Sequence, residues 1–301
     1  MTQRSAFRLF DAQVQDRLAL SPSLARIVLG GGDLADACTT GPDQRIKLFF
    51  PDVAGRLEVP RGEDWYARYR ALDPAERAPM RTYTIRRMRE SGEMEIDFVL
   101  HGDAGPASRW ALRARRGDRV AVLAPARGQT QASGVEWQPP AGVREVLLVA
   151  DETALPAAAN ILETLAATRQ PPAVRAFIEV PLAADRMALP APPQARIAWL
   201  PRAAKSCEPS HEHGARLLAA IGDTGFGHAA MAAPGVEPEE TEADRELIWE
   251  RATDGTSGFY AWIAGEAGAV MAIRRHLVGE RGLPKSAITF MGYWRKGRAL
   301  D

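Results

Sequence analysis

The chain has 301 residues, which is enough for two domains of ordinary size. Hydrophobic residues make up 46% and charged residues 25%, a composition typical of a soluble globular protein. Lys and Arg together number 38, as do Asp and Glu, and this zero net charge argues against nucleic-acid binding, which needs an excess of basic side chains.

No apolar run approaches the ~18 residues that a membrane-spanning helix needs. The first residues, Met1 to Ser5, lead into mixed polar sequence without the apolar core of a signal peptide, so we expect a cytoplasmic protein without membrane insertion. The two cysteines, Cys38 and Cys207, cannot supply a four-cysteine metal site and are more often free thiols than a disulfide in such a chain. Any redox centre should therefore be a bound organic cofactor.

The first half of the chain predicts short strands. Apolar and polar residues alternate in three segments: 45–50, 93–100 and 120–124. Glycine-rich turns separate the segments, and we interpret Gly30-Gly31-Gly32-Asp33 as a strand connection because it lacks the spaced glycines of a dinucleotide-binding loop. Several short strands with few helical patterns predict an antiparallel β-barrel over residues 1–138.

The second half of the chain has a different pattern. Residues 146–150 form a continuous apolar run, which is typical of a parallel strand covered on both faces. A helix with Pro156 in its first turn should follow. Further strands are expected at 174–180, 197–200, 259–264 and 288–291, with a helix at 267–281. This alternation predicts a parallel α/β domain over residues 139–301.

A polar insertion near residues 205–256 interrupts this domain. Its acidic centre is expected to be a mobile surface excursion, with helical stretches at 214–221 and 243–251. The triplet His211-Glu212-His213 hints at metal binding, but no third ligand accompanies it, so we predict no metal site.

The tetrad Arg81-Thr82-Tyr83-Thr84 is the most informative short motif. On a strand, Arg81 and Tyr83 point the same way, so a forked cation lies beside a flat apolar ring. A flavin nucleotide needs both, the cation for its pyrophosphate and the ring for its isoalloxazine. Taken alone, these four residues slightly favour an ordinary surface strand.

A second motif predicts an anion site. In Gly105-Pro106-Ala107-Ser108-Arg109-Trp110-Ala111, a glycine turn leads into a short helix whose free backbone N–H groups could cradle a phosphate. Taken singly, Ser108 is more often a helix cap and Trp110 a core residue.

Together the motifs resemble the siderophore-interacting proteins, which are FAD-containing ferric siderophore reductases. The resemblance runs from about Asp43 to Gly297 in matching order, and five segments carry it: Arg81-Thr82-Tyr83-Thr84, the stretch from Asp97 through Ala111, Asp151-Glu152-Thr153-Ala154-Leu155-Pro156-Ala157, the stretch from Trp262 to Val270, and Gly292-Tyr293-Trp294-Arg295-Lys296-Gly297. It implies a ferredoxin-reductase-like architecture, with an FAD-binding β-barrel followed by an NAD(P)H-binding α/β domain.

The resemblance also assigns site residues. It implies FAD contacts from Arg81, Tyr83, Thr84, His101, Ala107, Ser108 and Trp110. It implies an NAD(P)H site at Asp151, Glu152, Thr153, Ala154, Gly265 and Glu266. The implied reaction transfers a hydride from NAD(P)H to FAD and then single electrons to chelated Fe(III), releasing Fe(II). No protein residue needs to ligate the iron or act as a catalytic residue.

Ferric catecholate siderophores are anionic, so we expect basic side chains to bind the substrate. The candidates are Lys47, Arg127, Arg295 and Lys296. The donor is open: Glu179 could bind a ribose hydroxyl, whereas Arg202 and Lys205 could favour the 2′-phosphate of NADPH. We favour NADPH, with NADH or reduced ferredoxin as further possibilities within the family.

Two other functions compete with this prediction. One is a flavin reductase that passes electrons to a protein or to free flavin. The other is a siderophore-binding protein without catalysis, against which the FAD-binding residues weigh.

Overall fold

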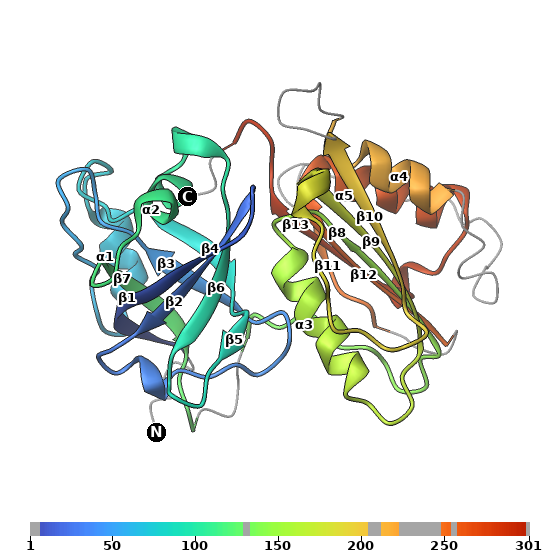
Figure 1. Cartoon of the computed structure of the whole chain (residues 1–301), viewed down its shortest axis with the longest axis horizontal. Helices are drawn as coiled ribbons and strands as arrows, with labels where there is room; N and C mark the ends of the chain where they lie inside the picture. Colours follow the sequence, from blue (N-terminus) through green and yellow to red (C-terminus); the bar gives the residue numbers. More distant parts are fainter. Residues whose placement is uncertain (1–6, 129–132, 204–211, 223–247, 254–257, 299–301) are drawn as a thin grey trace. The chain divides into compact units, whose positions relative to one another are not determined.

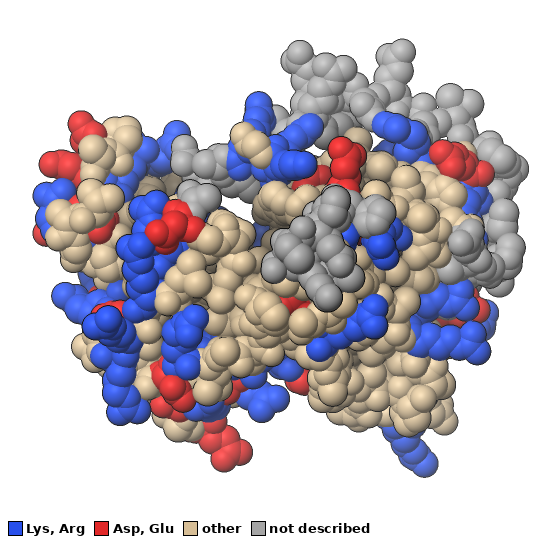
Figure 2. All heavy atoms as spheres, turned by 45° about the horizontal axis from the view of Figure 1, so that its top comes forward, with Lys and Arg blue, Asp and Glu red and all other residues tan. Residues whose placement is uncertain are grey.

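The computed structural model describes residues 7–128, 133–203, 212–222, 248–253 and 258–298. The chain divides into two compact units, one of residues 1–135 and one of residues 136–300 (Figure 1). The sequence places the domain boundary after residue 138. Positive and negative side chains are intermingled on the face that Figure 2 shows, in keeping with the zero net charge.

The first unit contains a seven-stranded antiparallel sheet in the order β4-β3-β7-β1-β2-β6-β5. Its strands are β1 (Phe7–Ser21), β2 (Leu24–Gly30), β3 (Arg45–Phe49), β4 (Met80–Thr84), β5 (Arg87–Met88), β6 (Met94–Val99) and β7 (Arg119–Pro125). The sheet curves around one core, but β4 and β5 at its two edges do not pair, so the barrel stays partly open (Figure 1). The predicted antiparallel barrel fold is confirmed.

The inner face of this sheet carries the predicted apolar residues. Met94, Ile96 and Phe98 of β6 lie in the same core as Val120 and Val122 of β7. Helix α2 (Pro106–Arg113) adds Ala107 and Ala111 to this core. Alternation therefore predicted which face of β6 and β7 lines this core.

The outer face of β6 differs from the prediction. Glu95 and Asp97, the charged residues that alternate with the apolar ones in this segment, are buried and not solvated. Arg26 of β2 reaches both carboxylates, with its Nε 2.6 Å from Asp97 Oδ1 and its Nη1 3.0 Å from Glu95 Oε2, and Arg89 Nε lies 2.6 Å from Glu95 Oε1. Cross-strand ion pairs cover these carboxylates, which no single-strand pattern can reveal.

Helix α1 (Trp65–Ala71) covers another part of the outer face. Tyr69 packs there in a small core with Phe49, Ala121 and Leu123. The edge of the Phe49 ring meets Tyr69 with a centroid distance of 5.7 Å. The sequence pattern around this helix carried no prediction.

The second unit is an α/β domain, as predicted. Its six-stranded sheet has the order β10-β9-β8-β12-β13-β11, and all neighbours are parallel except β11 and β13. The strands are β8 (Glu145–Ala150), β9 (Ala173–Leu182), β10 (Arg196–Ala203), β11 (Trp249–Glu250), β12 (Phe259–Glu266) and β13 (Ile288–Trp294).

Helices cover both faces of this sheet (Figure 1). Helix α3 (Leu155–Ala166) packs on one face, and its residues Ile161, Leu162 and Leu165 are buried as predicted. Helices α4 (Ala215–Gly222) and α5 (Ala267–Arg274) pack on the other face. A π-helical stretch, Arg275–Glu280, continues α5. None of the described helices is long and apolar enough to cross a membrane.

The insertion is described only in part. Helix α4 agrees with the helix expected at 214–221. The helix expected at 243–251 is wrong where the structure describes it, because Trp249 and Glu250 form strand β11. Trp249 stacks on Tyr293 of β13 with ring centroids 6.0 Å apart, so a long-range contact overrides the local helical pattern. Lys205, Cys207 and His211 lie outside the described residues, whereas Cys38 is a free thiol.

Candidate functional site

Strand β4 displays an aromatic surface in the first unit. Tyr83 is half-buried, and its ring centroid lies 4.3 Å from that of Phe98. Trp110 of α2, also half-buried, lies 5.7 Å from the same Phe98 ring and 5.1 Å from Phe50. Burial raises the pKa of the Tyr83 hydroxyl, while the charge of Arg81 opposes the shift. Tyr83 and Trp110 thus form the accessible rim of an otherwise buried cluster.

Arg81 lies on the same face of β4 as Tyr83, as the alternation predicts. Its Nη1 donates to the Met80 carbonyl oxygen at 2.7 Å. Within the described part of the chain, no carboxylate forms an ion pair with Arg81. The guanidinium therefore retains donors for an external anion.

Thr84 and Lys47 lie on the opposite face of the same strand pair. Lys47 pairs with Thr82 across β3 and β4, and its Nζ donates to Thr82 Oγ1 at 2.7 Å. Burial, followed by the charge of Arg45, lowers the pKa of the Lys47 ammonium group. Thr84 is buried on that face. The structure therefore does not bring Lys47 or Thr84 onto the surface that Arg81 and Tyr83 share.

The predicted phosphate-binding residues meet at the start of α2. No side chain caps this helix, whose N-cap is Gly105 and whose first residue is Pro106. The main-chain N–H groups of Ala107 and Ser108 belong to its first turn, where an anion is favoured. The Ser108 hydroxyl is already used, since it accepts from the N–H of His101 at 3.1 Å and donates to the Gly102 carbonyl oxygen at 2.7 Å.

The Ser108 hydroxyl therefore links α2 to the loop that carries His101. The group of Ser108 that could still bind a phosphate is its main-chain N–H. His101 itself is exposed. Arg127, after β7, is exposed as well, and its Nε donates to the Ala35 carbonyl oxygen at 3.1 Å.

The second candidate site lies in the α/β unit, where strand order reverses. The chain runs outward from β8 through β9 to β10, crosses to β11 at the opposite edge, and then returns to the other side of β8 as β12. In such sheets, nucleotides bind outside the carboxyl ends of the strands at this switch point. Asp151 follows β8 there, and Gly265 and Glu266 end β12. The structure brings the two predicted nicotinamide segments together.

Asp151 is the centre of this junction. It is buried, and its Oδ1 accepts from Thr153 Oγ1 at 2.5 Å and from the N–H groups of Thr153 and Ala154 at 2.9 and 3.2 Å. Its Oδ2 accepts from the N–H of Glu266 and from Trp294 Nε1, both at 2.8 Å. Burial, followed by the charge of Glu152, raises the pKa of the Asp151 carboxyl, and these donors oppose the shift.

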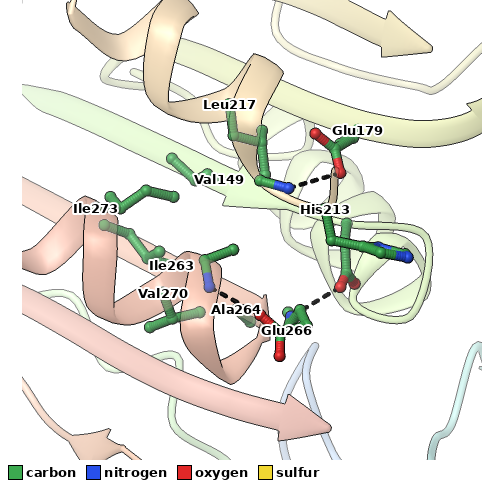
Figure 3. A pocket seen from close by; sticks show the side chains of 13 residues that line it. Val149, Glu179, His213, Leu217, Ile263, Ala264, Glu266, Val270 and Ile273 are labelled. Carbon is green, nitrogen blue, oxygen red and sulfur yellow. Dashed lines mark hydrogen bonds between the residues drawn. The ribbon is translucent and has the colours of Figure 1, made fainter. Parts of the chain in front are cut away.

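Glu266 is committed within the chain as well. It caps α5, with Oε2 accepting from the N–H of Ala269 at 2.8 Å (Figure 3), and Oε1 accepts from the N–H of Lys296 at 3.2 Å. The Lys296 side chain is exposed, and that of Arg295 is half-buried. Because Lys47 and Arg127 belong to one unit and Arg295 and Lys296 to the other, convergence of the four stays a prediction.

Glu152, Glu179 and Arg202 form a buried ion network. Arg202 donates from its terminal nitrogens Nη1 and Nη2 to the two carboxylate oxygens of Glu152, at 2.7 and 2.5 Å. Its Nη1 also lies 3.1 Å from Glu179 Oε1. Burial raises the pKa of the Glu179 carboxyl. For Arg202, burial opposes the charged form, but the ion pairs with Glu152 and Glu179 outweigh it, so the pKa of the guanidinium lies above its ordinary value. Glu179 is fully buried, so neither it nor Arg202 presents a free group to a ribose or a 2′-phosphate. Two of the residues considered for donor choice, Glu179 and Arg202, are thus occupied by an ion pair with each other.

Sequence reasoning missed two residues beside this network, His213 and Trp294. His213 lines a cavity of about 10 Å³, near the size of one water molecule, and Trp294 packs against the His213 ring. Figure 3 shows His213 between Glu179 and Glu266. The His213 ring meets Trp294 at 4.9 Å, and the next residue, Gly214, donates its N–H to Glu179 Oε1 at 3.0 Å. The His-Glu-His triplet was a signal, but it suggested a metal instead of this packing role.

Comparison with family models identifies the chain. A siderophore-interacting FAD-binding domain matches residues 13–130, and a siderophore-interacting protein model matches residues 143–297. The chain belongs to the siderophore-interacting protein family. The family resemblance predicted from the sequence motifs is confirmed.

Solved structures and curated relatives agree with this assignment. A siderophore utilization protein from T. fusca is 32% identical, with a TM-score of 0.73 over 99% of this chain and 97% of the other. Ferric vibriobactin reductase ViuB of Vibrio cholerae is 27% identical over 93% of this chain and 86% of its own. An Escherichia coli NADPH-dependent ferric-chelate reductase is 33% identical over 54% of this chain and 59% of its own.

A ferredoxin reductase from carbazole 1,9a-dioxygenase shares the fold at 16% identity, with a TM-score of 0.59 over 97% of this chain and 71% of the other. The siderophore-interacting protein described here thus has the ferredoxin-reductase-like architecture that the motifs implied.

Proposed function

We propose that the protein is an NAD(P)H-dependent, FAD-containing reductase of ferric siderophores. The observation that carries the proposal is the surface on β4 and α2, where Tyr83 and Trp110 flank Phe98 and where no carboxylate among the described residues pairs with Arg81. An aromatic surface beside a cation and an uncapped helix N-terminus suits a flavin nucleotide. The matched FAD-binding domain model supports the same cofactor.

These residues would hold the cofactor in distinct ways. Tyr83 would pack against the flavin ring, Arg81 would bind the pyrophosphate, and the first turn of α2 would donate N–H groups to a phosphate. When bound, FAD supplies the redox chemistry, since it can accept a hydride and release electrons singly. The protein would orient the flavin and exclude water from it.

NAD(P)H would bind the second unit at its switch point. The turn from Asp151 to Ala154 and the end of β12 meet there, and the hydrogen bonds of Asp151 and Glu266 fix their shape. The reductase relatives support a ferric chelate as the electron acceptor and, in one named case, NADPH as the donor. Reduced ferredoxin is the alternative donor. Reliance on NAD(P)H would place the reaction in the cytoplasm.

An absorption experiment tests this function. The purified protein should show a flavin spectrum that bleaches with anaerobic NADPH and recovers when a ferric tris-catecholate is added. Bleaching with NADH or reduced ferredoxin alone would change the donor. Bleaching without recovery by the chelate would favour a flavin reductase for another acceptor. A colourless protein that cannot be reconstituted with FAD would refute the proposal and leave a binding protein.

Substitution of two lysines tests the substrate site. Lys47→Ala and Lys296→Ala should each raise the KM for an anionic ferric chelate by roughly 3- to 10-fold, because each removes a cation worth on the order of 1 kcal/mol to the complex. Flavin content should stay at the wild-type level. Steady-state kinetics with a ferric tris-catecholate measures the effect, and an unaltered KM in both variants would remove the basic-pocket assignment.

A further inference from the structure

Asp151 has its hydrogen-bonding capacity filled from within the chain. Five donors meet its two oxygens, and they come from the turn after β8, from the end of β12 and from the end of β13. A carboxylate accepts about four hydrogen bonds, so no acceptor site remains for a nicotinamide cofactor. The sequence assigned Asp151 to cofactor contact, whereas its geometry suits a residue that acts through others.

The backbone around Asp151 is built for this close approach. A Cβ atom at Gly265 would lie 2.7 Å from Asp151 Oδ2, and Gly265 has a φ of +154°. A side chain at this position would collide with the carboxylate, so glycine is required where the end of β12 passes Asp151. The N–H of the next residue, Glu266, then reaches the same oxygen.

Two hydrogen bonds attach residues 294–296, at the end of β13 and just after it, to the carboxylates of Asp151 and Glu266. Trp294 Nε1 donates to Asp151 Oδ2, and the N–H of Lys296 donates to Glu266 Oε1. The His213 ring also packs against the Trp294 indole in an edge-to-face contact. Arg295 and Lys296, the two predicted substrate-binding residues of this unit, therefore lie in a segment held on both sides by the carboxylates of the switch point.

We propose that Asp151 is a positioning residue for the ferric substrate: through Trp294 and Glu266 it fixes the segment that presents Arg295 and Lys296 to an anionic chelate. This inference deepens the proposed function and rests on it. The substrate is the same anionic iron chelate, and the same junction orders the turn of Thr153 and Ala154. One carboxylate thus shapes the cofactor side and the substrate side of the unit.

Trp294→Phe is the sharpest test because it removes one donor and keeps an aromatic ring. Asp151 retains its bonds to Thr153, Ala154 and Glu266, so flavin reduction by NADPH should keep its wild-type rate constant. The affinity for gallium(III) tris-catecholate, which mimics the ferric complex but is not reduced, should fall roughly 3- to 10-fold. Trp249→Phe is the matched control, since Trp249 stacks on Tyr293 in the same sheet, and it should bind the gallium complex normally.

A double-mutant cycle separates positioning from general damage. If Trp294 acts by placing Arg295 and Lys296, then adding Trp294→Phe to the pair Arg295→Ala and Lys296→Ala should weaken gallium-chelate binding no further than that pair alone. Hydrogen exchange of the backbone amides of Glu266 and Lys296 should accelerate in Trp294→Phe. It should accelerate more in Asp151→Asn, because the side-chain N–H₂ of asparagine cannot accept the hydrogen bonds that Asp151 now accepts. Additive effects on binding, or unchanged gallium-chelate affinity in Trp294→Phe, would overturn the inference.

The same measurements distinguish this inference from the proposed function. Wild-type protein that binds the gallium complex but does not reduce the ferric complex would refute the reductase and keep the positioning role if Trp294→Phe still binds weakly. Wild-type protein that does not bind the gallium complex at all would overturn the inference.

Discussion

Replacing Arg81 with alanine should lower the affinity of the protein for FAD by roughly 10- to 100-fold. A charge-assisted hydrogen bond to a phosphate is worth about 1.5–3 kcal/mol, and Arg81 has donors that no described carboxylate occupies. Tyr83 would still pack against the flavin, so binding should weaken without being abolished. The ratio of flavin to protein absorbance in the purified variant measures the loss, and titration of the apoprotein with FAD yields the dissociation constant.

A control variant makes this result specific to the site. Arg119→Ala removes an exposed arginine from β7, two strands away from β4 in the sheet, and should retain wild-type FAD content. Both apoproteins should unfold at the wild-type urea concentration, which separates lost binding from lost folding. Full FAD occupancy with an unchanged dissociation constant in Arg81→Ala would remove its assigned role.

The sequence predicted those features that depend on local periodicity. Met94, Ile96 and Phe98 alternate with polar residues, and period two fixes which face of a strand is apolar. The continuous apolar run of β8 likewise predicted a central strand with helices on both sides. The sequence also predicted that residues 151–154 and 265–266 would lie close together, because turns that follow parallel strands lie at the same edge of the sheet.

Features that depend on pairing between distant segments were missed. Lys47 was predicted to bind the substrate, but the sequence did not reveal that cross-strand register pairs it with Thr82, on the face opposite Arg81 and Tyr83. Burial of Glu95 requires Arg26 from another strand. Trp294 gains its role only because its side chain, at the end of β13, reaches Asp151 after β8 across the intervening strand β12, a contact across 143 positions of sequence.

The same limit applies to Arg202, whose position after a strand suggested phosphate binding. Replacing Arg202 with methionine should lower the free energy of unfolding of the 136–300 unit by about 3–5 kcal/mol at neutral pH. The change leaves Glu152 and Glu179 buried without their shared cation, because Arg202 is the partner that pairs with both. Urea denaturation followed by tryptophan fluorescence measures the loss. The triple variant Arg202→Met, Glu152→Gln, Glu179→Gln removes the uncompensated charge and should regain much of the stability.

The loss should also depend on pH in a defined direction. Burial already raises the pKa of the Glu179 carboxyl, and the loss of Arg202, which opposes that shift, should raise its folded-state pKa further above the unfolded value of about 4.3. A raised carboxyl pKa costs no stability below the unfolded value and progressively more as pH rises through the folded value. Arg202→Met should therefore differ least from wild type near pH 4 and most near pH 7. An equal deficit at both pH values would show that lost packing, and not the two buried carboxylates, causes the instability.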